Sequence, residues 1–541
     1  MNPVTQTWPD DFAARYRAEG LWTGETFPAM LRDRAARFAG RTAVSGPGAR
    51  WNYAELLERA EALARGLLAR GLTPGDRVLV QMSNVPEYLS ATFGLFLAGL
   101  LPVFALPAHR RVELEHLARG AQVRAILTER RIAGHDHAAM AEALAADLPD
   151  LAHVLICETG GGEGLAALSS GAAELPADPD PQAVAFLQIS GGSTGLSKLI
   201  PRTHDDYLYS VRESAVISGL SPASVYLTVL PVSHNFTMSS PGVLGVLHAG
   251  GHVVMAPDPR PETGFRLIAE EGVTITALVP PLALKWIETA ERLRPEIGSL
   301  EVLLVGGAKF LPEAARRVRP VLGCTLQQVF GMAEGLVNYT RLDDPEEVIV
   351  TTQGRPISAL DEVRVVDDLD GDVPEGAPGN LLTRGPYTIR AYHDAPEANA
   401  RSFTEDGFYR TGDVVRRLPS GHLEVQGRAT DHINRAGEKI SAEEVEDHLL
   451  AHPEVLDAVV VSIPDSQLGE RICAFVLPGE GQAPRPAELR RFIRGRQIAA
   501  FKIPDEIRLV ESLGTTAVGK INRRALRAAL RKSYMDEEEQ A

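Results

Sequence analysis

Cysteine is scarce in this sequence. The chain of 541 residues contains Cys157, Cys324 and Cys473, which lie far from one another. An odd number of widely spaced cysteines supports neither a disulfide framework nor a zinc site, and it is typical of a reducing compartment. We therefore expect a cytoplasmic protein.

Basic residues are fewer than acidic residues. Lys and Arg total 55 against 71 Asp and Glu, which gives a formal net charge of −16. A chain this acidic lacks the basic surface with which proteins coat nucleic acid. We expect no nucleic-acid partner.

Long apolar runs are missing. The most apolar segment, residues 91–107, "ATFGLFLAGLLPVFALP", is interrupted by Pro102, and the part before that proline is too short to span a bilayer. We predict a buried helix followed by a buried strand, and no membrane association. The first 20 residues contain no basic segment leading into an apolar run, so we expect no signal peptide.

What the sequence does contain is an alternation of helix and strand patterns. Residues 53–71 repeat apolar positions at helical spacing, 76–82 form a strand pattern, and a helix follows from about 86 to 99. Strand patterns recur up to about residue 332. This alternation predicts an α/β fold with layered, mostly parallel sheets covered by helices on both faces.

The pattern changes in the last third of the chain. From about 345 to 427, shorter runs rich in turn residues predict a small β subdomain. Helix, strand, strand and helix patterns then follow, with a last helix near 522–532. We predict a large N-terminal part, 1–427, a hinge at 428–431, and a small mobile α+β domain, 432–541.

A loop rich in glycine and hydroxyl residues, "SGGSTGLSK" at 190–198, is the most unusual local feature. A flexible linker is a poor explanation, because a buried strand pattern precedes the loop and a helical pattern follows it. A Walker loop requires Lys followed by Ser or Thr after glycine, which is not found here. A phosphate-binding loop and a plain structural turn both remain open.

Further motifs follow this loop in a set order. They are "VFGMAEG" at 329–335, "YRTGD" at 409–413, "GRATDHINRAGEKI" at 427–440 and "VGKINRRAL" at 518–526. With the loop, they resemble the adenylate-forming (ANL) superfamily of acyl-CoA synthetases, luciferases and nonribosomal peptide adenylation domains. The segments 233–242 and 331–345 are most similar to stand-alone aryl-acid adenylating enzymes of the 2,3-dihydroxybenzoate–AMP ligase type. The sequence departs from the family pattern at Ser197, where the family usually has proline, and at "FTM", residues 236–238.

The resemblance implies an enzyme that activates 2,3-dihydroxybenzoate or a close hydroxy-aryl acid with ATP and Mg²⁺. It would release pyrophosphate and pass the acyl group to the phosphopantetheine thiol of an aryl carrier protein, in siderophore or aryl-capped nonribosomal peptide biosynthesis. Salicylate, 3-hydroxypicolinate and 3-hydroxyanthranilate remain alternative acids, and an aryl-CoA ligase is an alternative activity. A non-catalytic nucleotide sensor is the remaining alternative, which the retained catalytic residues argue against.

The resemblance also assigns roles in ATP binding. Glu334 would hold Mg²⁺, unless it is a solvated residue at a helix start, and Lys520 would contact the α-phosphate and the substrate carboxylate. Asp413, directly after a strand, would accept both ribose hydroxyls, and Arg428 would reach the ribose or α-phosphate, with surface salt bridges as the alternative for both. The phosphate loop would use Ser190, Gly191, Gly192, Ser193, Thr194, Gly195 and Lys198. The adenine slot would use Gly306, Gly307, Ala308, Val329, Phe330, Gly331, Met332 and Ala333, although Phe330 could be plain core.

Asn235 bears on which acid is bound. Relatives that activate amino acids have an aspartate at the matching position, which pairs with the substrate ammonium. A neutral amide cannot offset that charge but can bond an ortho-hydroxyl group or ring heteroatom. Ser240 would bond a ring substituent, and His234 would act at the carboxylate unless it is a packed structural residue. The acid would lie between Phe236, Gly307, Ala333 and Val337.

The C-terminal part carries features that suit acyl transfer. Thr430 matches the family's hinge position, and Gly437 falls where relatives place backbone beside the phosphopantetheine tunnel. Residues 485–502 are strongly basic, and no carrier domain is visible in the chain, so we expect an acidic carrier protein supplied in trans. Its docking residues would be Arg490, Arg491, Arg494 and Arg496, unless these form an ordinary solvated helix face.

Overall fold

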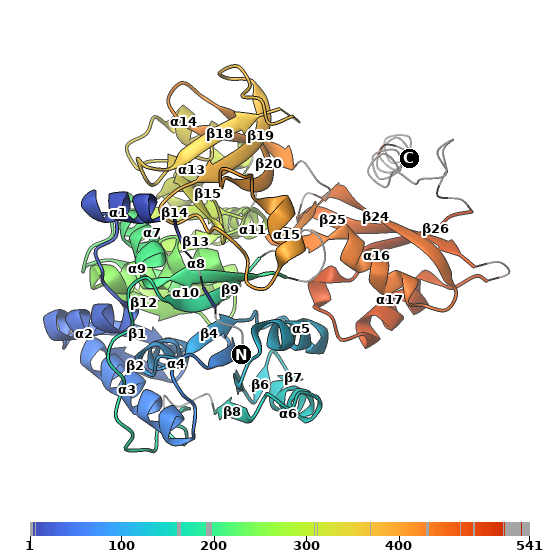
Figure 1. Ribbon diagram of the computed structural model, residues 1–541. Helices are drawn as coiled ribbons and strands as arrows, with labels where there is room; N and C mark the ends of the chain where they lie inside the picture. The colour runs from blue at the N-terminus through green and yellow to red at the C-terminus, as the bar shows by residue number, and fades with distance from the viewer. Residues whose placement is uncertain are drawn as a thin grey trace. The chain divides into compact units, whose positions relative to one another are not determined.

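The structure is a computed structural model that describes residues 4–5, 7–158, 164–190, 197–307, 309–310, 312–367, 369–428, 432–465, 467–479, 482–511, 513 and 532. The chain falls into two compact units (Figure 1). Unit 1 comprises Met1–Pro107, Leu117–Ile189 and Leu199–Gln426. Unit 2 comprises Ala108–His116, Ser190–Lys198 and Gly427–Ala541.

The largest sheet of unit 1 has the strand order β17-β16-β15-β14-β13-β11-β12-β1-β2. Neighbours from β15 to β1 are parallel, and antiparallel strands close both edges. The strands are β1 (Thr42–Gly46), β2 (Ala49–Asn52), β11 (Val225–Thr228), β12 (His252–Met255), β13 (Ile275–Leu278), β14 (Val302–Gly306), β15 (Thr325–Met332), β16 (Gly335–Tyr339) and β17 (Arg355–Pro356).

A second sheet of unit 1 has the order β10-β9-β4-β3-β5-β8, and its neighbours are parallel except for the hairpin of β9 and β10. Its strands are β3 (Arg77–Gln81), β4 (Leu101–Phe104), β5 (Ala125–Glu129), β8 (His153–Cys157), β9 (Val184–Ile189) and β10 (Leu199–Thr203), with a short separate hairpin of β6 (Arg131–Ile132) and β7 (His135–Asp136). The predicted layered and mostly parallel sheets are confirmed.

Helices follow most of these strands, and their starts are set locally. Asn52 and Glu55 form a capping box at α3, and Thr203 and Asp206 form one at α7. The helices are α1 (Asp10–Ala18), α2 (Phe27–Phe38), α3 (Tyr53–Ala69), α4 (Pro86–Leu97), α5 (Arg111–Ala121), α6 (His137–Asp147), α7 (His204–Ile217), α8 (Asn235–Ser239), α9 (Gly242–Ala249), α10 (Pro261–Glu271), α11 (Pro280–Leu293), α12 (Pro312–Ala315) and α13 (Val318–Leu322).

The apolar segment 91–107 forms the end of α4 and then β4, as predicted. Every residue of α4 is buried, so its apolar character serves the core of unit 1. In the part of the chain that the structure describes, no helix combines the length and apolarity that crossing a bilayer would need.

The β-rich segment of unit 1 forms a sheet of order β18-β19-β20-β21. Its strands are β18 (Glu362–Val366), β19 (Pro378–Arg384), β20 (Tyr409–Arg417) and β21 (Leu423–Arg428), accompanied by α14 (Glu346–Thr351) and α15 (Pro396–Ser402). Arg428 ends β21, and unit 2 resumes at Gly427.

Unit 2 holds a small sheet of order β23-β22-β25-β24, with β26 added beside β25. Its elements are β22 (His432–Arg435), β23 (Glu438–Ser441), α16 (Ala442–Leu450), β24 (Val455–Asp465), β25 (Gly469–Pro478), α17 (Pro486–Gly495), a short 3₁₀ turn (Ala500–Lys502) and β26 (Glu506–Leu509). Residues of both helices and of the sheet share one core. The predicted α+β character is confirmed, while the last helix, near 522–532, falls almost wholly outside the described residues.

One local prediction was wrong. The segment after the glycine loop was assigned to a helical pattern, but its first five residues form β10, antiparallel to β9. Pro201 and the β-branched Ile200 disfavour helix, and the Thr203 cap delays the start of α7 to His204. The glycine loop therefore joins two strands of a hairpin.

Candidate functional site

The glycine loop is closed at its base. The backbone N–H of Ser190 donates to the Lys198 carbonyl, and the Lys198 N–H donates to Ser190 Oγ, both at 2.9 Å. His116 contacts the Ser197 carbonyl through Nε2 at 2.8 Å. The predicted phosphate-binding residues Gly191, Gly192, Ser193, Thr194 and Gly195 lie outside the described residues.

Glu334 lies at the turn between β15 and β16. Its side chain is buried, at 7% exposure, which excludes the alternative of a solvated residue at a helix start. Tyr392 donates its hydroxyl to Glu334 Oε1 at 2.9 Å and lies 3.1 Å from the Tyr409 hydroxyl. Burial, with the charge of Glu334 beside it, raises the pKa of Tyr392, so this phenol stays a donor. Tyr392 thus fixes one carboxylate oxygen of Glu334.

The backbone beside Glu334 is held by a buried ion pair. Arg202 and Asp206, with side chains 2% and 0% exposed, lie 2.6 Å apart between Nη2 and Oδ1. Arg202 also donates to the carbonyls of Ala333, at 2.7 Å, and Tyr387, at 3.0 Å. One guanidinium therefore ties β10 and α7 to the turn that carries Glu334.

Tyr387 extends this network. Its hydroxyl donates to Asp361 Oδ2 at 2.6 Å and accepts from the Val337 N–H at 3.1 Å. Burial raises the pKa of Asp361 to about 7. The sequence motifs gave no sign of Tyr392, Tyr387 or Asp361. Arg202 and Asp206 could have been found as opposite charges four residues apart in an otherwise buried segment.

The predicted adenine residues meet across two neighbouring strands. Gly306, at the end of β14, is in register with Val329 of β15. A Cβ at Gly306 would lie 2.9 Å from the Val329 carbonyl oxygen and 3.0 Å from the Phe236 ring, so these groups pack too closely against Gly306 for a larger residue. Gly307 has a φ of +88°, which favours glycine.

The remaining adenine residues continue along β15. Phe330 is half-buried, and Gly331 and Met332 flank a register shift against β16. Ala333 carries the carbonyl that Arg202 binds. Ala308 lies outside the described residues.

Asp413 was expected directly after a strand, but it lies inside β20. The register between β19 and β20 shifts there, since Asn380 pairs with Val414 and Leu382 with Arg410. Gly412 in this irregularity has a φ of +75°, and the Asp413 N–H bonds Thr411 Oγ1 at 3.1 Å. This bulge determines where the Asp413 side chain points, and the residue is 5% exposed.

Four of the predicted acid-binding residues, His234, Asn235, Phe236 and Ser240, lie on α8 or cap it. His234 caps this helix, since its Nδ1 accepts from the Phe236 N–H at 3.3 Å. Asn235 Oδ1 accepts from the Tyr207 hydroxyl at 2.7 Å. His234 and Asn235 are partly exposed, whereas Phe236, Ser240 and Val337 are buried.

In unit 2, Gly437 follows Ala436 in the turn between β22 and β23, and their φ values are +90° and +51°.

Two of the four predicted docking arginines already form hydrogen bonds within unit 2. Arg490 donates to the carbonyls of Pro504 and Asp505, and Arg496 Nε lies 2.9 Å from His448 Nδ1. Arg491 and Arg494 are exposed, and no ion pair joins them to a described residue. Thr430 and Lys520 lie outside the described residues.

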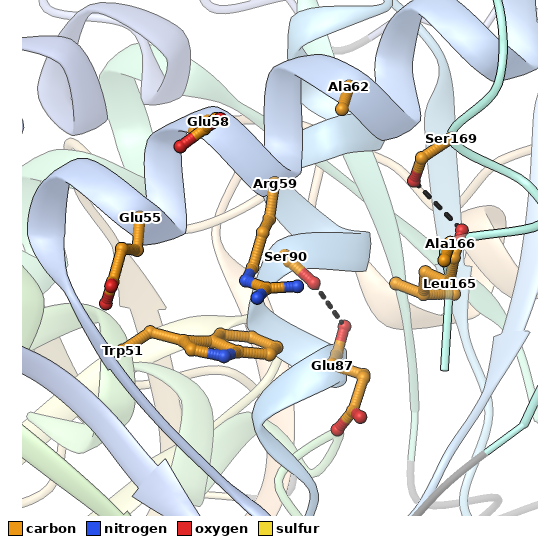
Figure 2. Close-up of a pocket in the computed structure, with 10 residues that line it drawn as sticks. All are labelled: Trp51, Glu55, Glu58, Arg59, Ala62, Glu87, Ser90, Leu165, Ala166 and Ser169. Atoms are coloured by element: carbon orange, nitrogen blue, oxygen red, sulfur yellow. Dashed lines mark hydrogen bonds between the residues drawn. The ribbon is translucent and has the colours of Figure 1, made fainter. Parts of the chain in front are cut away.

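A separate cavity of about 420 Å³ lies in unit 1 between α3, α4 and the segment 165–169 (Figure 2). The Arg59 guanidinium lies over the Trp51 ring, 4.6 Å from its centroid, and the buried Glu87 comes from the neighbouring helix α4. Glu55 and Glu58 also line the cavity. Carboxylates dominate this cavity, which makes it unsuited to a triphosphate. None of the predicted site residues lines it.

Comparison with known proteins gives matches over most of the chain. A family model described as AMP-binding enzyme matches residues 31–393, and one described as AMP-binding enzyme C-terminal domain matches 444–520. A 2,3-dihydroxybenzoate-AMP ligase of Bacillus subtilis is 54% identical over 530 residues, with 98% of each chain covered.

Two mycobacterial proteins are similar as well. A salicyl-AMP ligase / salicyl-S-ArCP synthetase of Mycobacterium tuberculosis is 45% identical, with 96% of this chain and 93% of the relative covered. The solved apo structure of Mycobacterium smegmatis MbtA superposes with a TM-score of 0.75 at 44% identity, and covers 97% of this chain and 98% of its own.

Proposed function

This chain belongs to the AMP-binding enzyme family, and from that premise we propose that it activates a small aryl carboxylic acid. It joins the acid to the AMP part of ATP and releases pyrophosphate. The preferred acid is 2,3-dihydroxybenzoate or a close hydroxy-aryl acid. The observation that carries this is the neutral, partly exposed Asn235 at the start of α8, in a chain 54% identical to a 2,3-dihydroxybenzoate-AMP ligase.

The chemistry explains why the site needs its charges. A carboxylate is a poor electrophile because its charge is delocalised, and hydroxide is a poor leaving group. Joining the carboxylate to the α-phosphate brings two anions together, so cations and fixed donors must offset their repulsion. Lys198 and Lys520 are the candidate cations for this task. Asn235 cannot neutralise a substrate ammonium, which disfavours α-amino acids.

The described residues fit a nucleotide and a metal ion. The predicted adenine residues Gly306 and Val329 lie in register on the neighbouring strands β14 and β15, which supports their sharing one face of a nucleotide site. Glu334 is a buried carboxylate with one oxygen fixed by Tyr392. Mg²⁺ takes one or two carboxylates and otherwise prefers phosphate oxygens and water. When bound, it would offset the charge that develops on the phosphates.

The acyl group then passes to the phosphopantetheine thiol of an aryl carrier protein, in siderophore or aryl-capped nonribosomal peptide biosynthesis. The exposed Arg491 and Arg494 on α17 support an acidic partner. Thr430 would be the hinge and Gly437 would border the thiol's path. The positive φ at Gly437 supports a turn that brings backbone close to a ligand.

ATP–pyrophosphate exchange over a panel of acids tests this proposal. The panel contains 2,3-dihydroxybenzoate, salicylate, 3-hydroxypicolinate, 3-hydroxyanthranilate, benzoate and several α-amino acids. We expect the hydroxy-aryl acids to give the highest rates. A preference for any α-amino acid would contradict the role of Asn235, and no exchange with any acid would contradict the activity. Thioester formation with free coenzyme A instead of a carrier would identify the aryl-CoA ligase.

A further inference from the structure

Tyr207 is a buried residue of α7 whose hydroxyl reaches the acid-binding residues. The side chain is 1% exposed and lies edge-on to Phe186, with ring centroids 4.7 Å apart. The Arg202 guanidinium lies over the Tyr207 ring, with Cζ 4.8 Å from the ring centroid. The ring is therefore packed on buried neighbours, and its hydroxyl donates to Asn235 Oδ1 at 2.7 Å.

This contact sets which end of the Asn235 amide points away from Tyr207, because hydrogen bonds with Ser239 and Gln188 use the acceptor side of the hydroxyl and leave its proton for Asn235 Oδ1. Burial raises the pKa of Tyr207 to about 12, so its hydroxyl keeps its proton near neutral pH. An amide oxygen only accepts, whereas the amide nitrogen carries two donors. With Oδ1 held by the buried tyrosine, Nδ2 is the end of the amide left to contact a ligand, and Asn235 as a whole is partly exposed.

The backbone of Asn235 is fixed as well. The residue opens α8, and Ser239 Oγ donates to the Asn235 carbonyl at 3.2 Å. Rotation about the side-chain bonds is therefore the main freedom that remains, and the Tyr207 hydrogen bond opposes it. Without that bond, the amide could turn and present its oxygen instead.

We propose that Tyr207 is a positioning residue that orients the Asn235 amide so that its N–H donors face the acid, and thereby selects acids with an acceptor beside the carboxylate. An ortho-hydroxyl donates its only proton to its own carboxylate, which leaves an oxygen lone pair facing outward. An ortho-amino group keeps a second N–H that faces outward as a donor. The oriented amide thus favours 2-hydroxybenzoates over 2-aminobenzoates. This inference rests on the proposed function, in which Asn235 contacts the acid.

The test compares kcat/KM in pyrophosphate exchange for 2-hydroxybenzoate and 2-aminobenzoate. In the unmodified enzyme we expect the hydroxy acid to be preferred. Tyr207→Phe keeps the ring packing and removes only the hydroxyl. We expect this preference to fall about tenfold, the size of one net hydrogen bond, through the KM of the acid while the KM of ATP is unchanged.

Tyr209→Phe is the matched control. Tyr209 lies on the same helix, and its buried hydroxyl makes a hydrogen bond of the same length, 2.7 Å, to Ser358 Oγ, away from Asn235. This variant should lose similar stability yet keep the acid preference. In an Asn235→Ala background, Tyr207→Phe should change the preference no further, because the two residues act as one unit.

The outcomes separate the hypotheses. Equal losses for both acids in Tyr207→Phe, or a preference change as large in Tyr209→Phe, would overturn the positioning role. If Tyr207→Phe does not fold, the unmodified enzyme still decides, since a preference for 2-aminobenzoate would contradict the inferred orientation. Absence of exchange with every aryl acid would instead overturn the proposed function.

Discussion

The proposed acid-binding region of unit 1 and helix α17 of unit 2 differ in how they hold their polar groups. Around α8 and the β15–β16 turn, Glu334, Asn235 and Val337 each bond a buried tyrosine, and Arg202 binds the turn itself. On α17, Arg491 and Arg494 are exposed. Positioning a small acid requires fixed donors, whereas attracting an acidic protein requires only accessible charge.

The strongest way to break this contrast is to remove the cation that holds the turn. Arg202→Met leaves Asp206 buried without its charge partner and frees the Ala333 and Tyr387 carbonyls. We expect the free energy of unfolding to fall by about 3–5 kcal/mol, measured by denaturant titration. Arg410→Met, which breaks an exposed pair with Asp370, is the control and should cost less than about 1 kcal/mol. Equal losses would contradict the anchoring role.

Lys520→Ala tests whether activation and transfer use different residues. We expect pyrophosphate exchange to fall about 10²- to 10³-fold, because a cation at the α-phosphate is lost. Transfer from supplied aryl-adenylate to the carrier should be retained, as followed by mass spectrometry of the carrier. Loss of both half-reactions together would refute this division of labour.

Asp361 makes the stability of the buried region depend on pH, which the exposed arginines of α17 are not expected to do. Its pKa is raised from 3.8 to about 7, so the folded state binds a proton that the unfolded state has released. The contribution of Asp361 to the free energy of unfolding is fully present below about pH 4 and is lost as the pH rises through about 7. The slope of this loss is up to about 1.4 kcal/mol per pH unit. Asp361→Asn should flatten this part of the pH profile in thermal denaturation. An unchanged slope would show that Asp361 is ionised throughout.

Charge reversal on α17 should have the mildest effect. The double variant Arg491→Glu, Arg494→Glu is expected to lower the rate of transfer to the carrier about tenfold at low salt, and less at high salt. Pyrophosphate exchange should stay unchanged. Arg485→Glu, which changes the N-cap residue of α17 that is paired with Glu488, serves as a comparison. A parallel loss of exchange would point to damage in unit 2 itself.

The sequence predicted well what depends on local pattern. The strand and helix alternation, the interrupted apolar segment and the change at about residue 345 correspond to sheets, to α4 with β4, and to the β18–β21 sheet. The start of α7 was misplaced because a helical pattern continued into a strand whose partner, β9, lies across the loop. The bulge at Asp413 was missed because it depends on pairing with β19.

The supporting residues could not be read from motifs. Tyr392 lies 58 positions from Glu334 in the chain, and Arg202 lies 131 positions from Ala333. Contacts across such separations arise only when sheets and helices assemble, so local patterns carry no record of them. The roles given to the glycine loop, Thr430 and Lys520 remain predictions.

The way that the β15–β16 region is anchored has a practical consequence for protein engineering. Arg202 holds Ala333, and Tyr387 holds Val337, by main-chain atoms alone. Under the proposed assignment of Ala333 and Val337 to the acid site, libraries that vary these two side chains would change ring selectivity while the backbone keeps its anchors, provided that Arg202 and Tyr387 are left unchanged.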